Sequence, residues 1–255
     1  MKVTVCELDD KSDGFEKDWQ GLAAHVKQAG SDLVSLPEMP FFPWPAWTDQ
    51  VDPAVWEQAV QAHEQWLARL QELAPAVVLG SRPVLDNAVP HNEAFVWEQA
   101  AGSTPSHRKY YLPEEEGFWE ASWYRRGEKD FQSISCAQAK VGFLLCTEMW
   151  FTEHARAYAR QGIELLACPR ATELSSLEKW VAGGRAAAVM SGSYCISSNR
   201  SGENNGVSWG GGGWVIDPDG QILGVTHADE RYLTREIDLA RAAAAKQTYP
   251  RYVKE

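Results

Sequence analysis

The chain has 255 residues, of which 44% are hydrophobic and 23% charged, and its 35 acidic and 24 basic residues give a formal net charge of −11. These proportions exclude a disordered chain, a collagen-like repeat and a coiled coil. A chain this acidic repels nucleic acid and anionic membrane, and no basic stripe reverses that. No apolar run approaches the roughly 18 residues that span a bilayer, and the first residues lack a signal-peptide core, so we expect a cytoplasmic protein.

The five cysteines and six histidines indicate neither a disulfide framework nor a metal site. The number of cysteines is odd and no two are spaced as a CxxC pair, so we interpret Cys6, Cys168 and Cys195 as buried thiols. The histidines lack the spacing of zinc ligands, and we interpret His107 and His154 as structural. We therefore expect no metal.

The first half of the chain alternates apolar runs with segments of helical periodicity. We predict a strand at 1–8, a helix at 15–30, a strand at 32–36, a proline-rich loop at 37–47, a helix at 53–73, and strands at 76–82 and 92–97 joined by a turn. Residues 102–130 have no clear period, and we predict that they are mostly loop.

The second half repeats this alternation. We predict a strand at 140–145, a helix at 152–161, a strand at 163–167, a helix at 177–190, strands at 194–198, 214–216 and 222–225, and a last strand at 233–239. The strands at 214–216 and 222–225 flank a DPDG turn, which is typical of a hairpin. No change of composition indicates a linker, so we expect residues 1–255 to form one α/β domain with two packed sheets.

Three reactive side chains lie where apolar runs meet loops, the region where active sites of open α/β sheets form. They are Glu38, Lys109 and Cys146. Taken alone, Glu38 and Lys109 are compatible with solvated loop charges, and Cys146 with a small buried hydrophobe. Taken together, they supply a nucleophilic thiol, a general base and a cation that can hold an oxyanion. This combination predicts acyl transfer.

The order of these residues resembles the nitrilase superfamily of carbon–nitrogen hydrolases, which carries Glu, Lys and Cys on three separate loops. The run CTEMWFTEHAR at 146–156 is similar to the amidase and N-carbamoyl-amine branch. True nitrilases usually carry Trp directly after the Cys, where this chain has Thr147. The resemblance implies a four-layer αββα sandwich and a homodimer or higher oligomer that packs through the helix at 152–161.

The resemblance also implies roles for the site residues. Cys146 would attack the carbonyl carbon, Glu38 would take its proton, and Lys109 with the backbone N–H of Thr147 would hold the oxyanion. A second carboxylate is expected after the Lys loop. The pattern from Lys109 favours Glu120, and Glu116 is the alternative.

The predicted reaction is hydrolysis of a linear, non-peptide amide or N-carbamoyl C–N bond through a Cys thioester, with release of ammonia or an amine and with no cofactor. The alternatives are a nitrilase and a catalytically idle relative that only binds a ligand. Arg170 is a candidate partner for a substrate carboxylate, and Glu148 or Glu153 for an amine, but these charges are also compatible with ordinary salt bridges. The candidate substrate-binding residues are Glu116, Trp119, Glu148, Trp150 and Arg170. The glycines at 210–213 are interpreted either as a place where the backbone passes close to the substrate or as a flexible connection between strands.

Overall fold

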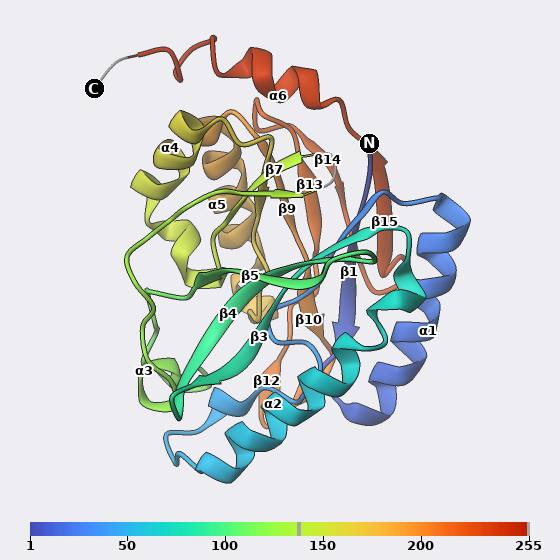
Figure 1. Ribbon diagram of the computed structural model, residues 1–255, viewed down its shortest axis with the longest axis vertical. Coiled ribbons are helices and arrows are strands. Elements are labelled where there is room, and N and C mark those ends of the chain that lie inside the picture. Colours follow the sequence, from blue (N-terminus) through green and yellow to red (C-terminus); the bar gives the residue numbers. More distant parts are fainter. Residues whose placement is uncertain (137–138, 254–255) are drawn as a thin grey trace.

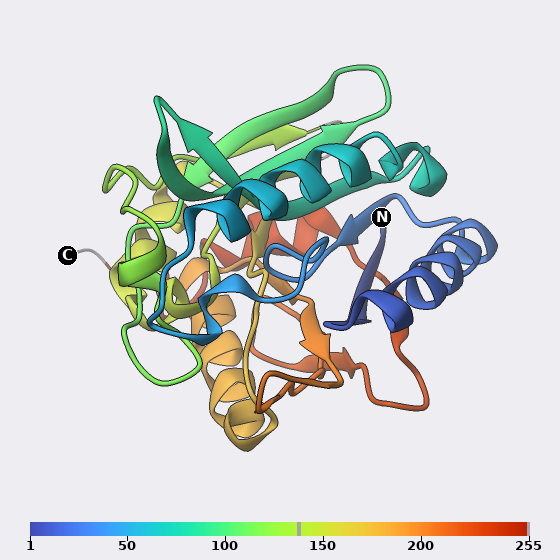
Figure 2. The same ribbon diagram turned by 90° about the horizontal axis from the view of Figure 1, so that it is seen from below.

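Two β-sheets lie face to face between two layers of helices (Figure 1). The structure is a computed structural model that describes residues 1–136 and 139–253. Helices α1 (Ser12–Ala29) and α2 (Pro53–Leu67) cover the outer face of the first sheet, and α4 (Thr152–Gln161) and α5 (Leu177–Ser191) cover that of the second (Figures 1 and 2). The predicted αββα sandwich is therefore confirmed.

The first sheet is built mainly from the first half of the chain. Its strands run in the order β10-β1-β2-β3-β4-β5, with β15 paired antiparallel to β1. Strands β1, β2 and β3 are parallel, and β4 and β5 continue antiparallel. The bounds are β1 (Lys2–Asp9), β2 (Leu33–Ser35), β3 (Val77–Asp86), β4 (Val89–Glu98), β5 (Gly102–Arg108), β10 (Asn199–Ser201) and β15 (Tyr232–Glu236).

The second sheet has the order β14-β13-β9-β8-β7-β6, and β7, β8 and β9 are parallel. Its bounds are β6 (Ile134–Cys136), β7 (Ala139–Phe143), β8 (Leu165–Ala167), β9 (Tyr194–Ser197), β13 (Trp214–Ile216) and β14 (Ile222–Val225). After β9 the chain passes through Ser198 into β10, so it crosses from the second sheet to the first. A small separate hairpin joins β11 (Glu203–Asn204) to β12 (Val207–Ser208).

The period of two along the strands divides the core into layers. In β1, Val3 and Val5 lie in the core between the sheets, whereas Cys6 and Leu8 pack in the cluster that contains the apolar face of α1. Ring contacts add to that outer cluster, where Trp19 of α1 meets Trp66 edge to face. On the other side of the molecule, α4 and α5 bury their own apolar faces with the outer side of the second sheet.

Three predicted elements differ from the structure. The helix predicted at 53–73 ends at Leu67, and a 3₁₀ turn, η2 (Leu70–Leu73), follows it. Residues 102–108, predicted as loop, form β5, because pairing with β4 satisfies the backbone despite Pro105. The last strand ends at Glu236, and α6 (Leu239–Ala245) begins there because the Asp238 carboxylate accepts a hydrogen bond from the Ala240 N–H.

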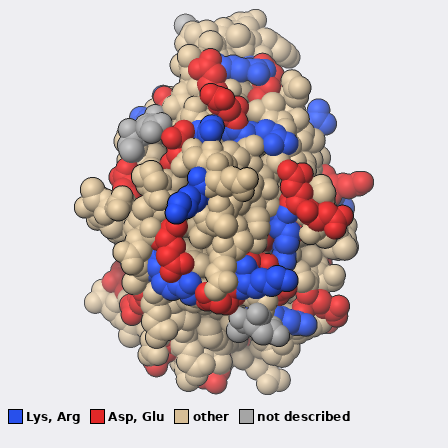
Figure 3. Space-filling view, turned by 90° about the vertical axis from the view of Figure 1, so that its right-hand side faces the viewer, with Lys and Arg blue, Asp and Glu red and all other residues tan. Residues whose placement is uncertain are grey.

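The surface carries side chains of both charges, as the 35 acidic and 24 basic residues of the sequence lead us to expect. On the face in Figure 3, Lys and Arg side chains alternate with Asp and Glu and form no broad basic patch. Within the described residues, no helix has both the length and the apolar character that crossing a membrane requires.

Candidate active site

The loops that follow β2, β5 and β7 carry the three predicted catalytic residues. Glu38 follows β2, Lys109 follows β5 directly, and Cys146 follows β7 as the first residue of the 3₁₀ turn η3 (Cys146–Trp150). Glu38 and Lys109 therefore come from the first sheet and Cys146 from the second. The site forms only where the two sheets are packed together.

The loop after β8 holds the backbones of both Cys146 and Glu38. The Cys146 N–H donates to the carbonyl of Pro169 at 3.0 Å, and the Glu38 N–H donates to the carbonyl of Arg170 at 3.1 Å. Since these two carbonyls belong to consecutive residues, the backbones of Cys146 and Glu38 are both attached to the same short segment of the chain.

Lys109 is fully buried between two carboxylates. Its Nζ donates to Glu38 Oε1 at 2.8 Å and lies 2.6 Å from Glu120 Oε2. The Asn92 side-chain amide donates to the same Glu38 oxygen at 2.7 Å. The Tyr124 hydroxyl donates to Glu120 Oε2. Short α3 (Glu120–Trp123) thus brings the second carboxylate to the ammonium.

This arrangement keeps Lys109 charged. Burial lowers its pKa, but Glu120 and Glu38 together raise it above the ordinary value. Burial raises the pKa of Glu120 to about 7, an effect that Lys109 opposes and Glu38 reinforces. The protonation of Glu120 therefore depends on the charge of Lys109.

Cys146 is buried and its thiol is protonated at rest. Burial raises the thiol pKa above the ordinary value, Glu38 raises it further, and Lys109 opposes both. The thiol therefore needs a base at the moment of attack. Glu38 Oε2 is buried and has no hydrogen-bond partner among the described residues. It is thus the atom that can accept the thiol proton.

A pocket of about 150 Å³ opens onto this group. Its volume suits a small substrate. Glu120, Cys146 and Thr147 line the pocket together with Pro113, Glu115, Phe118, Ala171, Thr172, Glu173, Ser176 and Trp180. Trp180 comes from α5, and sequence reasoning did not assign it to the pocket.

Comparison with known proteins decides the family, because the model of carbon-nitrogen hydrolases matches residues 2–247. The chain belongs to the carbon–nitrogen hydrolase family. It is an enzyme that hydrolyses carbon–nitrogen bonds. It is similar to the omega-amidase of Mus musculus, with 30% identity over 249 residues that cover 94% of this chain and 88% of that protein.

Two further comparisons agree. The N-carbamoylputrescine amidase of Oryza sativa subsp. japonica is 29% identical over 171 residues, which cover 60% of this chain and 56% of that protein. A carbon-nitrogen hydrolase from Helicobacter pylori G27 has the same fold, with a TM-score of 0.86, 23% identity and coverage of 99% and 94% of the two chains.

Arg170 of this carbon–nitrogen hydrolase is committed to the protein interior. The side chain is buried, and its Nε and Nη1 donate to Ser197 Oγ and Thr172 Oγ1, both at 2.8 Å. Nη2 donates to the Gly212 carbonyl, and the guanidinium lies 3.9 Å from the centre of the Trp214 ring. Arg170 is therefore placed to support the loop after β8, away from a substrate carboxylate.

The other substrate-binding candidates are outside the pocket as well. Glu148 is fully buried and contacts His107. Trp150 is 45% exposed and packs on Trp180. Glu116 is exposed and Trp119 is half-buried, and neither lines the pocket. Of the two rival carboxylates, Glu120 meets Lys109 and Glu116 does not.

Two polar residues of the hydrolase site escaped sequence reasoning. Asn92 lies in β4 and holds Glu38, but one Asn in a strand carries no signal of that role. Arg200 follows the crossing of the chain between the sheets, and its Nε donates to the Glu38 carbonyl at 3.1 Å. Arg200 also pairs with buried Asp10, which fixes the loop that carries Glu38.

In the hydrolase, the backbone of the glycine run at 210–213 passes close to the buried carboxylate of Glu7. The Gly212 N–H donates to buried Glu7 Oε1 at 2.8 Å. A Cβ at Gly211 would lie 2.5 Å from the Glu7 carboxylate, and the φ of Gly211 is 53°. Both observations require glycine there.

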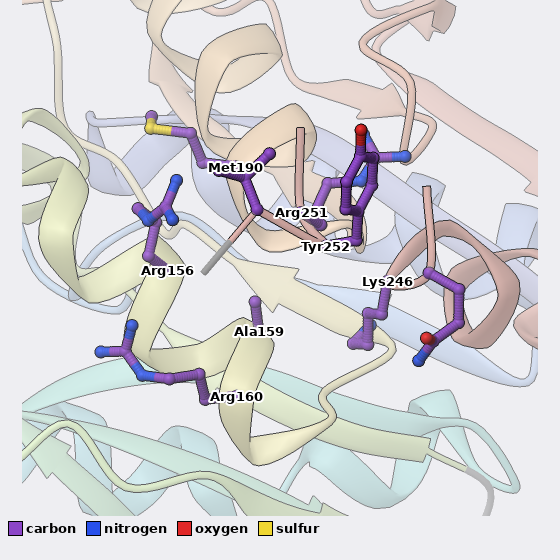
Figure 4. A pocket seen from close by; sticks show the side chains of 9 residues that line it. Arg156, Ala159, Arg160, Met190, Lys246, Arg251 and Tyr252 are labelled. Atoms are coloured by element: carbon purple, nitrogen blue, oxygen red, sulfur yellow. The ribbon is translucent and has the colours of Figure 1, made fainter. Parts of the chain in front are cut away.

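A larger cavity of about 440 Å³ lies away from Cys146, between α4, α5 and the segment after α6 (Figure 4). Arg156 and Arg160 of α4 line it together with Lys246 and Arg251. Lys246 and Arg251 are engaged by backbone carbonyls of the structure itself. Their contacts attach the C-terminal segment to the second helical layer.

Proposed function

We propose that this enzyme hydrolyses a small linear amide or N-carbamoyl compound, with Cys146 as nucleophile, Glu38 as general base, and Lys109 with the Thr147 N–H as oxyanion donors. The observation that carries the proposal is the buried, unpartnered Oε2 of Glu38 beside a thiol whose pKa is raised. A protonated thiol with a base next to it suits attack coupled to proton transfer.

The steps follow from these positions. The proton of the Cys146 thiol passes to Glu38 Oε2 while sulfur bonds to the carbonyl carbon, and the displaced electron pair goes to the oxygen. Lys109 and the Thr147 N–H hold that oxyanion. The C–N bond then breaks, and the leaving nitrogen takes the proton from Glu38. Water attacks the thioester with Glu38 as base, the C–S bond breaks, and the sulfur regains a proton as the acid leaves.

Glu120 has a supporting role in this proposal. It neutralises part of the Lys109 charge and holds the ammonium in place, while the Tyr124 hydroxyl fixes its carboxylate. Because the pKa of Glu120 is raised to about 7, a proton can be shared within the group near neutral pH.

The charge of the pocket favours neutral or cationic substrates. Its lining contains Glu115 and Glu173 and, among the described residues, no Lys or Arg side chain. Arg170, the one candidate receptor for a carboxylate, has all its bonds inside the protein. The rice relative named for N-carbamoylputrescine, whose diamine portion is a cation at neutral pH, agrees with that preference.

The test compares substrates that differ in one feature. The same organic group is offered with a terminal amide, N-carbamoyl amine or nitrile, and kcat/KM is measured by ammonia release. We expect the amide or carbamoyl compound to exceed the nitrile by well over tenfold, that is, by more than about 1.4 kcal/mol of transition-state stabilisation. Equal rates, or a preference for the nitrile, would contradict this substrate class.

A second series tests the charge preference. Amides of equal length that end in an ammonium, a methyl group or a carboxylate are compared in wild type and Glu173→Gln. We expect the amides that end in a carboxylate to have the lowest kcat/KM in wild type. We expect Glu173→Gln to reduce the ratio of kcat/KM between the ammonium and carboxylate compounds. Cys146→Ala serves as the control and should release no ammonia from any of them.

We also infer that the enzyme is a cytoplasmic homodimer or higher oligomer that packs through α4. The cysteines form no disulfide among the described residues, which suits a reducing compartment. Directly before α4, the large apolar side chain of Trp150 is 45% exposed, so it is available for a contact between subunits. Sedimentation equilibrium tests the assembly, and Trp150→Glu should shift it toward monomer.

A further inference from the structure

Glu148 and His107 form a buried ion pair behind the catalytic loops. The side chains are 0% and 1% exposed, and His107 Nε2 lies 3.0 Å from Glu148 Oε1 and 2.9 Å from Oε2. The other ring nitrogen, Nδ1, lies 3.2 Å from the carbonyl of Asp130. Both ring nitrogens thus face acceptors, so His107 carries a proton on each.

The same carboxylate contacts the two loops that carry the nucleophile and the ammonium. Glu148 Oε1 accepts from the Tyr110 N–H at 2.7 Å, directly after Lys109. Oε2 accepts from the Leu145 N–H at 2.8 Å, directly before Cys146. One side chain therefore joins the loop of the first sheet to the turn of the second.

The turn at Cys146 needs such support because its backbone is strained. Cys146 has a φ of 49°, a left-handed conformation that non-glycine residues rarely adopt. Such a conformation persists only where the surroundings hold it. The bond from the Leu145 N–H to Glu148 and the bond from the Cys146 N–H to Pro169 hold the backbone directly before and at this residue.

We propose that Glu148, held by His107, is the positioning residue that sets the separation of the Lys109 ammonium and the Cys146 thiol. This inference rests on the proposed function, because the separation matters only if both groups act in one reaction. Glu148 contacts neither the pocket nor the reacting atoms, so it acts through the two loops. A displacement of about 1 Å in such a geometry costs about 10²-fold in rate.

Glu148→Gln is the sharpest substitution. Both carboxylate oxygens accept from backbone N–H groups, whereas glutamine offers one acceptor oxygen and an amide that can only donate. One of the two loops must then lose its bond. We expect kcat to fall about 10²-fold, while KM changes less than about threefold because the pocket lining is intact.

His107 offers a graded pair of variants if Glu148→Gln fails to fold. His107→Gln keeps a donor near the position of Nε2, so its kcat should stay within about threefold of wild type. His107→Leu removes the donor and the charge, so its kcat should fall at least tenfold. Tyr158→Phe is the matched control, because the Tyr158 hydroxyl is buried and donates to the carbonyl of Phe143 in β7, and no hydrogen bond joins it to the Lys109 loop among the described residues.

Two measurements separate positioning from plain stability. The first is kcat per folded enzyme on the best amide, beside the melting temperature. The second is the rate of Cys146 alkylation by iodoacetamide, read by mass spectrometry, which needs no amide turnover. We expect Glu148→Gln and His107→Leu to slow alkylation about tenfold, and Tyr158→Phe to lower the melting temperature with kcat and alkylation unchanged.

Failure of the two ideas can be told apart. If wild type hydrolyses no amide, the proposed function fails, and the alkylation rates still test the positioning role. If folded Glu148→Gln or His107→Leu keeps wild-type alkylation and kcat, the positioning role is overturned. The same holds if Tyr158→Phe loses as much rate as either variant.

Discussion

At the scale of single residues, the ammonium of Lys109 forms ion pairs with two carboxylates, one on each side. Glu38 and Glu120 both contact its ammonium, and Glu38 also has a buried oxygen with no hydrogen-bond partner among the described residues. Removing either the base or the cation therefore disturbs the remaining partners. The measured cost of each change includes that rearrangement.

We expect Glu38→Gln and Lys109→Met each to lower kcat/KM by about 10²–10⁴-fold, because a general base or an oxyanion donor is typically worth that much. In the double variant the losses should be far from multiplicative, since the two groups act as a unit. Steady-state kinetics of the four enzymes measure this. Independent, multiplying losses would argue against a shared group.

The ion pair of His107 predicts a pH-dependent stability. Burial lowers the pKa of His107, but Glu148 and the carbonyl of Asp130 raise it overall above the ordinary 6.5. A second histidine nearby, His154 of α4, has a lowered pKa and stays neutral near pH 7. The folded protein therefore holds the His107 proton more tightly than the unfolded chain does.

The stabilisation by the pair is complete below about pH 6.5 and is lost as pH rises through the folded-state pKa of His107. We expect the difference in unfolding free energy between wild type and His107→Gln to be largest near pH 6 and to shrink toward pH 9. Urea unfolding at a series of pH values measures it. A difference that grew with pH would contradict the charged pair.

At the scale of elements, two glycines allow α5 to approach the site closely. A Cβ on Gly184 would lie 2.9 Å from the Trp214 ring, and one on Gly183 would lie 2.9 Å from the Trp150 ring. The Trp214 ring in turn packs against the guanidinium of Arg170. The distance between α5 and the loop after β8 therefore depends on these two positions.

Gly184→Ala should destabilise the enzyme by about 1–3 kcal/mol, because the added methyl group overpacks a rigid ring. At an open helical position the same change would stabilise by roughly 0.5–1 kcal/mol, so the sign is diagnostic. Urea unfolding measures it. Ala186→Gly, at an exposed position of the same helix, is the control for helix propensity alone and should leave kcat unchanged.

The sequence predicted those elements whose pattern is local. The strands at 1–8 and 140–145 and the helix at 152–161 have clear periods, and their positions are confirmed within a few residues. Strand β5 could not be predicted, because its polar sequence is a strand only through pairing with β4. The short, alanine-rich α6 follows a strand without a glycine or proline to mark the change.

The same limit holds for the site. Glu38, Lys109 and Cys146 were found through a motif, and their roles stay predictions. Asn92 and Tyr124 look like ordinary strand and loop residues. Asn92 is 54 residues from Glu38 and reaches it only because β4 and β2 lie in the same sheet, and Tyr124 reaches Glu120 only through the turn of α3.

At the scale of the whole molecule, catalysis and global folding should be inseparable. Because Glu38 and Cys146 belong to different sheets, the site cannot survive loss of the core between them. We expect activity, tryptophan fluorescence and far-UV circular dichroism to share one urea midpoint. Activity that disappeared well before the fluorescence change would show that the site opens locally.

The order of elements also shows that one unit is used twice. The series β1-α1-β2-α2-β3-β4 and β7-α4-β8-α5-β9-β13 have the same succession and the same strand directions. Within this internal symmetry, the counterpart of Glu38 after β2 is Arg170 after β8, and these two residues are joined by a backbone hydrogen bond. In the proposed mechanism the first unit carries the base Glu38 and the second carries the nucleophile Cys146, while Lys109 follows β5, outside both units, so neither unit alone contains the complete catalytic set.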